Sequence, residues 1–489
     1  MVVTTPFPAR DVLAQRAQGL WSALPADVIE LAAAFTDGGH EIALVGGPVR
    51  DAFLGRSSAD LDFATSATPD ESEAAIRAWG GTTWDLGREF GTVAGLKGDV
   101  TVEVTTYRSD AYEEGSRKPV VAFGDSLEGD LARRDFTVNA MAVRLPSLEF
   151  VDPFGGLDDL AKGRLRTPIE PEVSFGDDPL RMMRAARFAS QLGATVEATT
   201  AGAIETMAER IAIVSAERVR DELTKLMLGA EPRRGIEILV DSGLAEHVIP
   251  EVPALRLEAD EHHHHKDVYE HTLTVVDQAI DLETGPDGPV PRPDLVLRLA
   301  ALFHDIGKPA TRRFEPGGAV SFHHHEVVGA KMTARRLKAL RFDKATVRAV
   351  ARLVELHLRF HGYGEATWTD SAVRRYVTDA GEQLERLHRV TRADCTTRNQ
   401  RKAERLSFAY DDLEKRIAEL REQEELQAIR PDLDGEQIMA ILGIPPGRDV
   451  GEAYRFLLEL RMEEGPLGED VARERLLAWW SERTGSTRR

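Results

Sequence analysis

Asp60 and Asp62 lie two residues apart in the stretch DLDFAT, whose composition predicts a β-strand. Residues two apart on a strand point to the same face, so the two carboxylates would stand side by side. Paired carboxylates suit Mg²⁺, and two-metal sites suit phosphoryl or nucleotidyl transfer. The alternative is a surface turn with two solvated aspartates. Glu103, on a neighbouring predicted strand, is either a third carboxylate or another solvated residue.

Two glycines precede this pair. Gly46 and Gly47 stand between a predicted strand, EIALV, and residues that suit a helix. Glycines at such a junction let the backbone approach a ligand closely, and the N-terminus of the following helix favours a phosphate. Arg50 lies just inside that helix, where a guanidinium can bind phosphate oxygens. The sequence therefore predicts a phosphate-binding turn beside the carboxylates.

The elements that would position these residues fall into two regimes. Between about 41 and 165, strand candidates mix with helices, and Val100, Val102 and Val104 alternate with polar residues as in a half-buried strand. Thr68-Pro69-Asp70-Glu71 has the pattern of a helix start. From about 175 onward almost every segment has helical spacing, with no convincing strand. The fold class is therefore α+β: a mixed-sheet head followed by an all-α body.

Composition narrows the functional classes. The chain has 489 residues and a formal charge of −20. One cysteine, Cys395, excludes a disulfide framework and a cysteine-based zinc cluster, and no long apolar run predicts a membrane span. A cytoplasmic protein fits best. The charge disfavours nonspecific coating of nucleic acid. However, residues 331–405 hold 18 Lys and Arg against 9 Asp and Glu, a basic stretch that would steer phosphate, cradle RNA or simply be a solvated helical face.

Further strings resemble a known family. GGPVRD…DLD looks like a nucleotidyltransferase head of the polymerase-β type. LARRDFTVNAMA, DPFGGLDDL, DDPLRMMRAARFASQLG and ERVRDELTKLM follow in order between residues 131 and 227. Together they resemble the class II CCA-adding tRNA nucleotidyltransferases and the related bacterial poly(A) polymerases. This family usually has Glu-Asp where the present chain has Asp177-Asp178.

The resemblance implies a set of roles. Asp60 and Asp62 would hold catalytic Mg²⁺, with Glu103 as a candidate third carboxylate. Contacts to the triphosphate and ribose would come from Gly47, Arg50 and Arg134. Asp178 and Arg181 would read the base, with Arg184 and Arg187 nearby for phosphate or base.

The chemistry of Asp178 and Arg181 agrees with base reading. At positions i and i+3 of a predicted helix they would be neighbours. A carboxylate accepts from the exocyclic amine that cytosine and adenine both carry, and an arginine donates to the adjacent ring acceptor. Uracil and guanine present a carbonyl there instead. One pair would thus accept CTP and ATP without a template, although an arginine-rich helix can also be a solvated face.

A second constellation occupies the helical body. His271, His304-Asp305 within FHDIGKP, and Asp394 resemble the ligand set of HD metal-dependent phosphohydrolases. Imidazole and carboxylate ligands suit Mn²⁺, Ni²⁺ or Zn²⁺, which activate water for attack on phosphate esters. The alternative is a vestigial HD fold without metal. Further candidates are His325 and His357 as ligands and Lys308 for a substrate phosphate; the runs His262–His265 and His323–His324 are better explained as solvated loops.

These interpretations predict four regions: a head (1–165), a helical base-reading and RNA-binding region (166–255), an HD domain (256–400) and a C-terminal tRNA-binding region (401–489). The expected activity is addition of C, C and A to the tRNA 3′ end from CTP and ATP, with neither DNA nor a membrane as partner. Residues 108–126 read as a mobile loop, which the family's C-only enzymes lack. The alternatives are a poly(A) polymerase, or a phosphohydrolase whose head only binds RNA.

Overall fold

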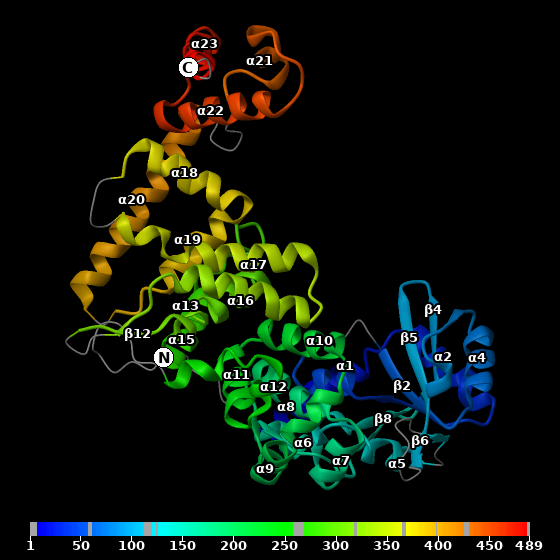
Figure 1. Ribbon diagram of the computed structural model, residues 1–489. Helices are drawn as coiled ribbons and strands as arrows, with labels where there is room; N and C mark the ends of the chain where they lie inside the picture. The colour runs from blue at the N-terminus through cyan, green and yellow to red at the C-terminus, as the bar shows by residue number, and fades with distance from the viewer. Residues whose placement is uncertain are drawn as a thin grey trace. The chain divides into compact units, whose positions relative to one another are not determined.

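The computed structural model describes residues 7–56, 61–111, 120–123, 126–257, 268–316, 320–363, 368–397, 399–424 and 430–486. The chain divides into two compact units, residues 1–250 and 251–489. The first unit combines a sheet with helices, whereas the described part of the second is helical apart from one short hairpin (Figure 1). The predicted α+β class, with a mixed sheet followed by helices, is confirmed.

A seven-stranded sheet in the order β3-β4-β5-β2-β1-β8-β9 forms the head. Its strands are β1 (Ile42–Val45), β2 (Leu61–Thr65), β3 (Thr82–Asp85), β4 (Thr92–Lys97), β5 (Val100–Thr106), β8 (Ala142–Leu145) and β9 (Glu149–Val151). β2 and β5 run parallel, and the other neighbours pair antiparallel. A one-residue connection at Tyr107 separates β5 from β6 (Arg108–Ala111), which pairs with β7 (Val120–Phe123).

Helices accompany the strands in the described part of the head, and some of them contact the sheet. They are α1 (Arg10–Trp21), α2 (Ala26–Asp37), α3 (Gly47–Phe53), α4 (Pro69–Ala78), α5 (Leu127–Ala132) and α6 (Gly156–Ala161). α4 starts with the predicted capping box between Thr68 and Glu71. Gly95 of β4 leaves room for Ile76 of α4 and for Val102 of β5, so these apolar side chains share one face of the sheet. Figure 1 shows α2 and α4 together beside the strands.

The rest of the first unit is helical: α7 (Pro171–Asp177), α8 (Leu180–Leu192), α9 (Ala198–Met207), α10 (Ala216–Met227), α11 (Pro232–Asp241) and α12 (Leu244–Val248). α8 packs against α10 and α11 and buries an apolar face that includes Met182, Met183 and Phe188. Gly235 of α11 permits the close approach, because a Cβ there would lie 2.8 Å from the Ala186 carbonyl oxygen.

The second unit is a stack of helices. They are α13 (Val268–Asp281), α14 (Leu295–Phe303), α15 (Lys308–Thr311), α16 (His325–Ala339), α17 (Lys344–Leu356), α18 (Asp370–Ala380), α19 (Leu384–Ala393), α20 (Gln400–Glu424), α21 (Gly435–Leu442), α22 (Arg448–Glu464) and α23 (Glu469–Ser486). Short 3₁₀ turns precede or join them, among them His357–Gly362. Helices α21 to α23 share a separate small core built on Ile438, Leu457 and Leu476.

Three predictions about strands are wrong in detail. Residues 142–152 (AVRLPSLEFVD), whose sequence predicts a single strand, form two strands, because Pro146 and Ser147 lie in the turn between β8 and β9. Within the predicted 108–126 loop, residues 108–111 and 120–123 form the paired strands β6 and β7. Residues 112–119 and 124–125 lie outside the described residues. Two-residue strands also occur within the helical part: β10 (Arg164–Leu165) pairs with β11 (Thr195–Val196), and β12 (Arg313–Phe314) with β13 (Val320–Ser321).

Candidate active sites

Two predicted carboxylates of the head lie on adjacent strands. Asp62 of β2 is directly opposite Glu103 of β5 in the parallel register, so both side chains point to the same face. Because side chains alternate along a strand, this is the face opposite Val102 and α4. Both residues are half-buried. Asp60 lies outside the described residues, so its predicted pairing with Asp62 stays a prediction.

The glycine turn stands at the same end of β1. Leu44 lies opposite Phe63 in the antiparallel register, which brings the following residues of β1 next to Asp62. Gly46 has φ 72° and ψ −128°, a conformation that only glycine adopts readily. A Cβ at Gly46 would also lie 2.7 Å from Nη1 of Arg134. Gly46, rather than the predicted Gly47 at the first position of α3, is thus the residue whose backbone and surroundings require glycine.

Three predicted phosphate-binding arginines gather around one aromatic ring. The guanidinium carbons of Arg50, Arg184 and Arg187 lie 5.2, 5.6 and 4.1 Å from the centre of the Phe188 ring. Arg50 also donates from Nη1 to Asn139 Oδ1 at 2.7 Å. α3 and α8 deliver these cations from positions far apart in sequence, so the ring of Phe188 organises a positively charged cluster.

Two buried carboxylates neutralise this cluster. Arg184 Nε donates to Asp135 Oδ2 at 2.7 Å, and Arg187 Nε lies 3.0 Å from Glu222 Oε2. Burial alone would raise the pKa of Asp135, but Arg184 and the hydrogen bond from Asn139 outweigh it and lower the pKa to about 2. Burial and repulsion by Arg184 lower the pKa of Arg187 to about 10, so it remains a cation at neutral pH.

The proposed base reader is arranged differently from the prediction. Asp178 is not on a helix with Arg181: its backbone is extended between α7 and α8. Its Oδ1 accepts from Leu180 N at 3.1 Å, and its Oδ2 accepts from Arg218 Nη2 at 2.8 Å. Arg181 donates to Ser174 Oγ at 2.8 Å and to the Arg133 carbonyl at 2.6 Å. Both side chains are held in place, but by other partners.

Sequence reasoning missed several residues that support the head site. Asp135, Phe188, Arg218 and Glu222 all fall inside the motif strings LARRDFTVNAMA, DDPLRMMRAARFASQLG and ERVRDELTKLM. Their acidic, aromatic or cationic character was visible. Their partners were not, because the contacts Asp135–Arg184 and Asp178–Arg218 span 49 and 40 residues of chain.

The histidine–aspartate set of the second unit converges as predicted. His271 Nε2 lies 2.9 Å from Asp394 Oδ1 and 3.3 Å from His304 Nε2. On the other side, His325 Nε2 is 3.2 Å and His357 Nε2 is 3.9 Å from Asp305 Oδ1. Asp305 therefore belongs to two groups of three possible ligands, His271–His304–Asp305 and Asp305–His325–His357, each with its donor atoms within 4.8 Å of one another.

The backbone orients the imidazoles of this set. His304, His325 and His357 place Nδ1 2.8, 2.9 and 2.7 Å from the carbonyl oxygens of Ala301, Phe322 and Val354. Such a bond fixes the ring and turns Nε2 toward the centre of the site. Glycine at 307 is needed for this packing, since a Cβ there would lie 2.1 Å from the His325 carbonyl oxygen.

Protonation of the site is compatible with metal ligation. Burial and the neighbouring His304 lower the pKa of His357 to about 3, so its ring is neutral near pH 7. Burial also disfavours the charged form of His304, but Asp305 and Asp394 outweigh this and raise its pKa to about 10. Lys308 Nζ lies 2.9 Å from Asp305 Oδ2. A set of four imidazoles and two carboxylates, of which only His271 and Asp394 are partly exposed, fits a divalent transition metal, whose binding would release the His304 proton.

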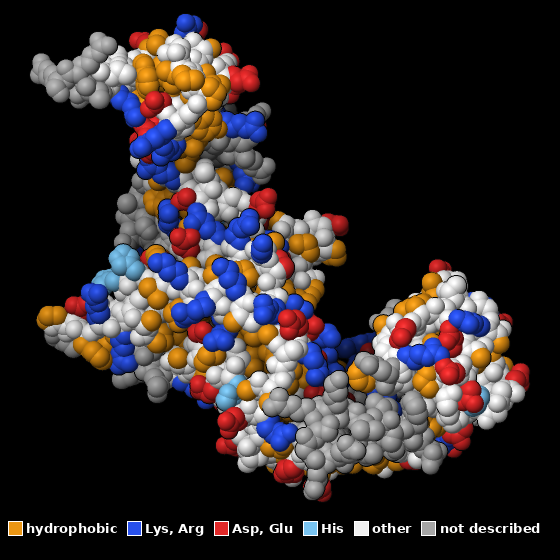
Figure 2. Space-filling view, turned by 45° about the vertical axis from the view of Figure 1, so that its right-hand side comes forward, with side chains coloured by type: hydrophobic (Ala, Val, Ile, Leu, Met, Phe, Trp, Pro, Cys, Tyr) orange, Lys and Arg blue, Asp and Glu red, His pale blue; other side chains and the backbone are white. Residues whose placement is uncertain are grey.

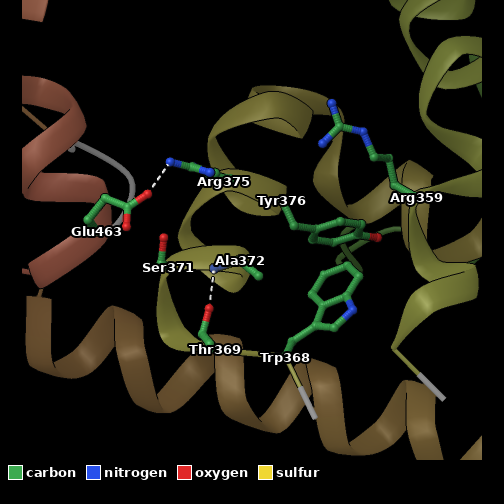
Figure 3. Close-up of a pocket in the computed structure, with 8 residues that line it drawn as sticks. All are labelled: Arg359, Trp368, Thr369, Ser371, Ala372, Arg375, Tyr376 and Glu463. Carbon is green, nitrogen blue, oxygen red and sulfur yellow. Dashed lines mark hydrogen bonds and ion pairs between the residues drawn. The ribbon is translucent and has the colours of Figure 1, made fainter. Parts of the chain in front are cut away.

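A cavity of about 470 Å³ lies elsewhere in the second unit. Figure 3 shows Trp368 and Tyr376 along one side of it, with Arg375 directed toward Glu463 and Arg359 on a separate segment. Both arginines are compensated: Arg375 pairs with Glu459 and Glu463, and Arg359 Nη1 lies 2.9 Å from Asp379 Oδ2. The cavity is therefore aromatic in part but not strongly cationic.

A divalent-metal nucleotidyltransferase head joined to an HD domain is the class of protein that the fold and the two sites define. Family models agree: the poly A polymerase head domain matches residues 42–166, the probable RNA and SrmB-binding site of polymerase A matches 193–255, and the HD domain matches 268–399. Within the described residues no helix combines the length and apolar character that crossing a membrane requires.

Whole-length relatives settle the family. The chain is 36% identical to the A-adding tRNA nucleotidyltransferase of Deinococcus radiodurans, across 90% of this chain and 96% of the relative. It is 33% identical to the CC-adding enzyme of Thermus thermophilus, across 89% and 93%. The chain belongs to the tRNA nucleotidyltransferase and poly(A) polymerase family. The Bacillus velezensis CCA-adding enzyme is 44% identical, but only over 44% of this chain and 53% of its own.

Solved structures agree with the fold. The CCA-adding enzyme of Bacillus stearothermophilus in complex with CTP aligns with a TM-score of 0.67 at 25% identity, covering 94% of this chain and 98% of that one. The Thermotoga maritima CCA-adding enzyme complexed with tRNA aligns with a TM-score of 0.59 at 19% identity. The second of these likenesses concerns the fold alone.

Proposed function

We propose that this protein adds C, C and A to the 3′ end of tRNA, with CTP and ATP as nucleotide donors. The observation that carries the proposal is the face of the head sheet on which Asp62 and Glu103 lie opposite each other, at the level of the Gly46 turn. The proposal also draws on whole-length relatives that add A or CC to tRNA.

In the reaction, the RNA 3′-hydroxyl attacks the α-phosphorus of the nucleotide and pyrophosphate leaves. Asp60 and Asp62, with Glu103, would hold Mg²⁺, which when bound lowers the pKa of the hydroxyl and stabilises the developing charge. Gly47, Arg50 and Arg134 would position the triphosphate and ribose, with Arg184 and Arg187 close by. Because Asp135 and Glu222 already fix Arg184 and Arg187, little reorganisation is needed when the nucleotide binds.

Base selection would come from Asp178 and Arg181. Asp178 accepts from the exocyclic amine of cytosine or adenine, and Arg181 donates to the neighbouring ring nitrogen. A base with a carbonyl in place of the amine leaves these half-buried groups without a partner on the base, which disfavours UTP and GTP. The head (1–165) and the base-reading region (166–255) would together perform the transfer, while the C-terminal region (401–489) would contact tRNA.

A nucleotide-addition assay tests this function. The protein is incubated with tRNA transcripts ending before the 3′ terminus, after the first C and after the second C, with each nucleotide alone and with CTP plus ATP. The expected products are C, C and A, ending there. The relatives make two other outcomes informative: A added only to a CC end, or CC without A, would each replace the proposal by a partial activity. Long tails from ATP alone would identify a poly(A) polymerase.

The HD domain (256–400) supports a second activity. We infer that His271, His304, Asp305 and Asp394 hold a divalent metal such as Mn²⁺, Ni²⁺ or Zn²⁺, with His325 and His357 able to complete a second group around Asp305. A bound metal would supply Lewis acidity for hydrolysis of phosphate esters. The substrate would be a 2′,3′-cyclic phosphate, a 2′-nucleotide or a phosphate monoester at a damaged RNA end, with Lys308 neutralising the phosphate.

Metal content decides whether this site is loaded. The purified protein and its Asp305→Ala and His357→Ala variants are compared by elemental analysis, with His323→Ala, an exposed histidine outside the ligand groups, as the matched control. We expect metal in the parent and the control, with loss in both ligand variants. Equal metal in all four proteins would refute the ligand assignment.

A further inference from the structure

An exposed tryptophan lies on the edge strand of the head sheet. Trp84 of β3 is 41% exposed, and Leu96 of β4 is 38% exposed. In the antiparallel register Trp84 lies opposite Ala94, two residues before Leu96, so the two apolar side chains are diagonal neighbours on one face. Figure 2 shows acidic and basic side chains intermixed on the surface of the head. A tryptophan beside an exposed leucine on such a surface indicates a binding site.

The strand register places Trp84 in one row with two candidate catalytic carboxylates. Trp84 lies opposite Ala94, and Ala94 lies opposite Glu103 of β5. Glu103 in turn lies opposite Asp62 of β2. Residues that lie directly opposite each other point to the same face of a sheet, so all four side chains share one face. Neighbouring strands are about 4.8 Å apart, which places the Cα of Trp84 about 10 Å from that of Glu103. In this row the small side chain of Ala94 stands between them.

The face that carries this row is the more open face of the sheet. Helix α4 packs against β3, β4 and β5. On β5, the side chains that point toward α4, Val102 and Val104, are buried, whereas Glu103 on the other face is partly exposed. In the part of the chain that the structure describes, Trp84 makes no ring contact and no side-chain hydrogen bond. Its ring is therefore available to a ligand.

The backbone that carries Trp84 is held in place. Asp85 Oδ1 accepts from Gly87 N at 2.8 Å and from Arg88 N at 2.7 Å, which closes the turn after β3. Arg88 Nη1 then donates to Glu73 Oε2 of α4 at 2.7 Å. A ring on a fixed strand loses little freedom when a flat ligand stacks on it, and this favours binding.

The Gly46 turn and Trp84 lie on opposite sides of the carboxylates. Gly46 follows β1, which neighbours β2 on one side, whereas Trp84 is on β3, which lies beyond β5 and β4 on the other side. In an in-line displacement the attacking oxygen approaches from the side opposite the leaving group. Because the triphosphate, and with it the leaving pyrophosphate, is assigned to the Gly46 turn, the attacking RNA end approaches from the side of β4 and β3.

We propose that Trp84 stacks on a nucleobase of the RNA primer close to its reacting 3′ end, and so holds that end beside the carboxylates. The inference rests on the proposed nucleotidyl transfer. Every base presents a π-face, so an indole binds RNA in this way without reading its sequence. Such tolerance suits an enzyme whose primer gains a new terminal base at each addition. A second copy of this chain is the competing occupant, but it would cover the side from which the primer reaches Asp62 and Glu103.

Steady-state kinetics with a truncated tRNA transcript as primer test this role. Trp84→Ala should raise the KM for the transcript about tenfold, because stacking on one base contributes binding of that order, with little change in kcat or in the KM for CTP and ATP. Trp84→Phe keeps a flat ring and should stay near the parental KM, whereas Trp84→Leu, apolar but not flat, should behave like Trp84→Ala. Val12→Ala, which shortens an apolar side chain of α1 that is 42% exposed, is the matched control and should keep all these constants.

Abasic primers identify the stacked base. Transcripts with an abasic residue at each of the last three positions are compared with the intact transcript. With the parental protein, one of them should show a KM about tenfold higher, and Trp84→Ala should bind that primer no more weakly than the intact one. The intact primer should also quench part of the indole fluorescence of the parental protein, and this part should be missing in Trp84→Phe.

A parental KM for the transcript in Trp84→Ala would overturn the stacking role, and so would a rise in the KM for CTP or ATP instead. A change of oligomeric state in Trp84→Ala, measured by sedimentation, would assign the exposed side chains to an interface between two copies of the chain. Parental protein that adds no nucleotide to any transcript would overturn the proposed function rather than the role of Trp84. Urea unfolding verifies that each variant folds.

Discussion

The head site and the HD site hold their charged groups in different ways. In the head, the cations are long arginines from α3 and α8, each steadied by an acidic or amide side chain and by the Phe188 ring. In the HD site, short imidazoles are tied by Nδ1 to carbonyls of their own chain segments and meet around Asp305. His304 and Asp305 are 0% and 2% exposed, whereas the Arg184 side chain is 33% exposed.

The difference matches what each site is proposed to bind. A nucleotide is large, brings its own charges and must leave after each cycle, so arginines with compensated charge, of which Arg184 is partly exposed, suit it. A metal ion is small and stays, so buried ligands held at fixed orientation suit it better. Substitutions should therefore separate the two sites, since they share no residue and lie in separate compact units.

The largest expected effect is that one substitution in each site removes the activity of that site and leaves the other site unchanged. Asp62→Ala should lower the rate of nucleotide addition by at least about 10³-fold, with the metal content of the HD site unchanged. Asp305→Ala should do the reverse, abolishing metal binding and any phosphatase activity while nucleotide addition continues. Addition rates and elemental analysis on the same preparations measure both. Asp99→Ala, an exposed aspartate in the β4–β5 turn, is the control for both assays.

Asp305→Ala could instead stop nucleotide addition while the protein keeps its parental stability. That result would show that the head site depends on the HD site, and it would contradict their independence. Persistent addition in Asp62→Ala would show that the catalytic assignment in the head is wrong. Either outcome is readable without knowing the substrate of the HD domain.

Asp135→Asn should give the next largest effect, on stability. Asp135 is buried and pairs with the partly exposed Arg184, so removing its charge leaves that guanidinium, among the described residues, with only Glu222, 4.0 Å away, as a counterion, at a cost of about 2 kcal/mol. The folded pKa of about 2 lies below the ordinary value of 3.8, so the stabilisation is complete above about pH 4 and is lost as the pH falls toward 2. Urea unfolding at pH 7 and across that acid range measures both.

The variant should lack this part of the acid dependence. Asp130→Asn is a useful comparison, since Asp130 is also buried but pairs with Arg134 at the longer distance of 3.2 Å. If the parental protein and Asp135→Asn lose stability equally between pH 4 and 2, Asp135 does not carry the effect.

Gly46→Ala should harm catalysis more than folding. The positive φ costs about 1–3 kcal/mol for a residue with a side chain, and the added Cβ would displace the guanidinium of Arg134. Misplacing a group that positions the nucleotide lowers kcat/KM by about 10- to 100-fold. Gly19→Ala in α1, where nothing lies within 4 Å of the added atom, is the matched control and should be neutral or slightly stabilising. Equal kinetics in both variants would exclude this role of the turn.

Sequence reasoning located the sites better than it described them. Local patterns were sufficient for the capping box at Thr68, for the strands around Asp62 and Glu103, and for the histidines and aspartates that the structure brings together in the HD domain. Each depends on neighbours within a few residues or on a strong motif. The prediction that Asp178 and Arg181 are adjacent on a helix was wrong, because Pro179 lies between α7 and α8 and the chain is extended at Asp178.

What sequence could not supply was long-range pairing. A buried carboxylate such as Glu222 is indistinguishable in sequence from the solvated acids on the same helix, for example Glu217 and Asp221. Only the packing of α10 on α8 decides which of them meets an arginine of α8. The same packing brings Arg218, which had no assigned role, to the side chain proposed to read the base.

Arg218 provides the smallest and most specific prediction. Its guanidinium donates to one oxygen of Asp178, so Arg218→Ala should make the Asp178 side chain more mobile while the carboxylate itself remains. We expect discrimination of CTP and ATP against UTP and GTP, measured as ratios of kcat/KM, to fall about tenfold. Arg218→Lys should recover part of this loss. Arg220→Ala, two residues along and paired with Asp221, should leave the ratios unchanged. A uniform fall in kcat/KM for all four nucleotides would mean that Arg218 supports the fold of α10 rather than the choice of base, and that the head site discriminates through Arg181 and Asp178 alone.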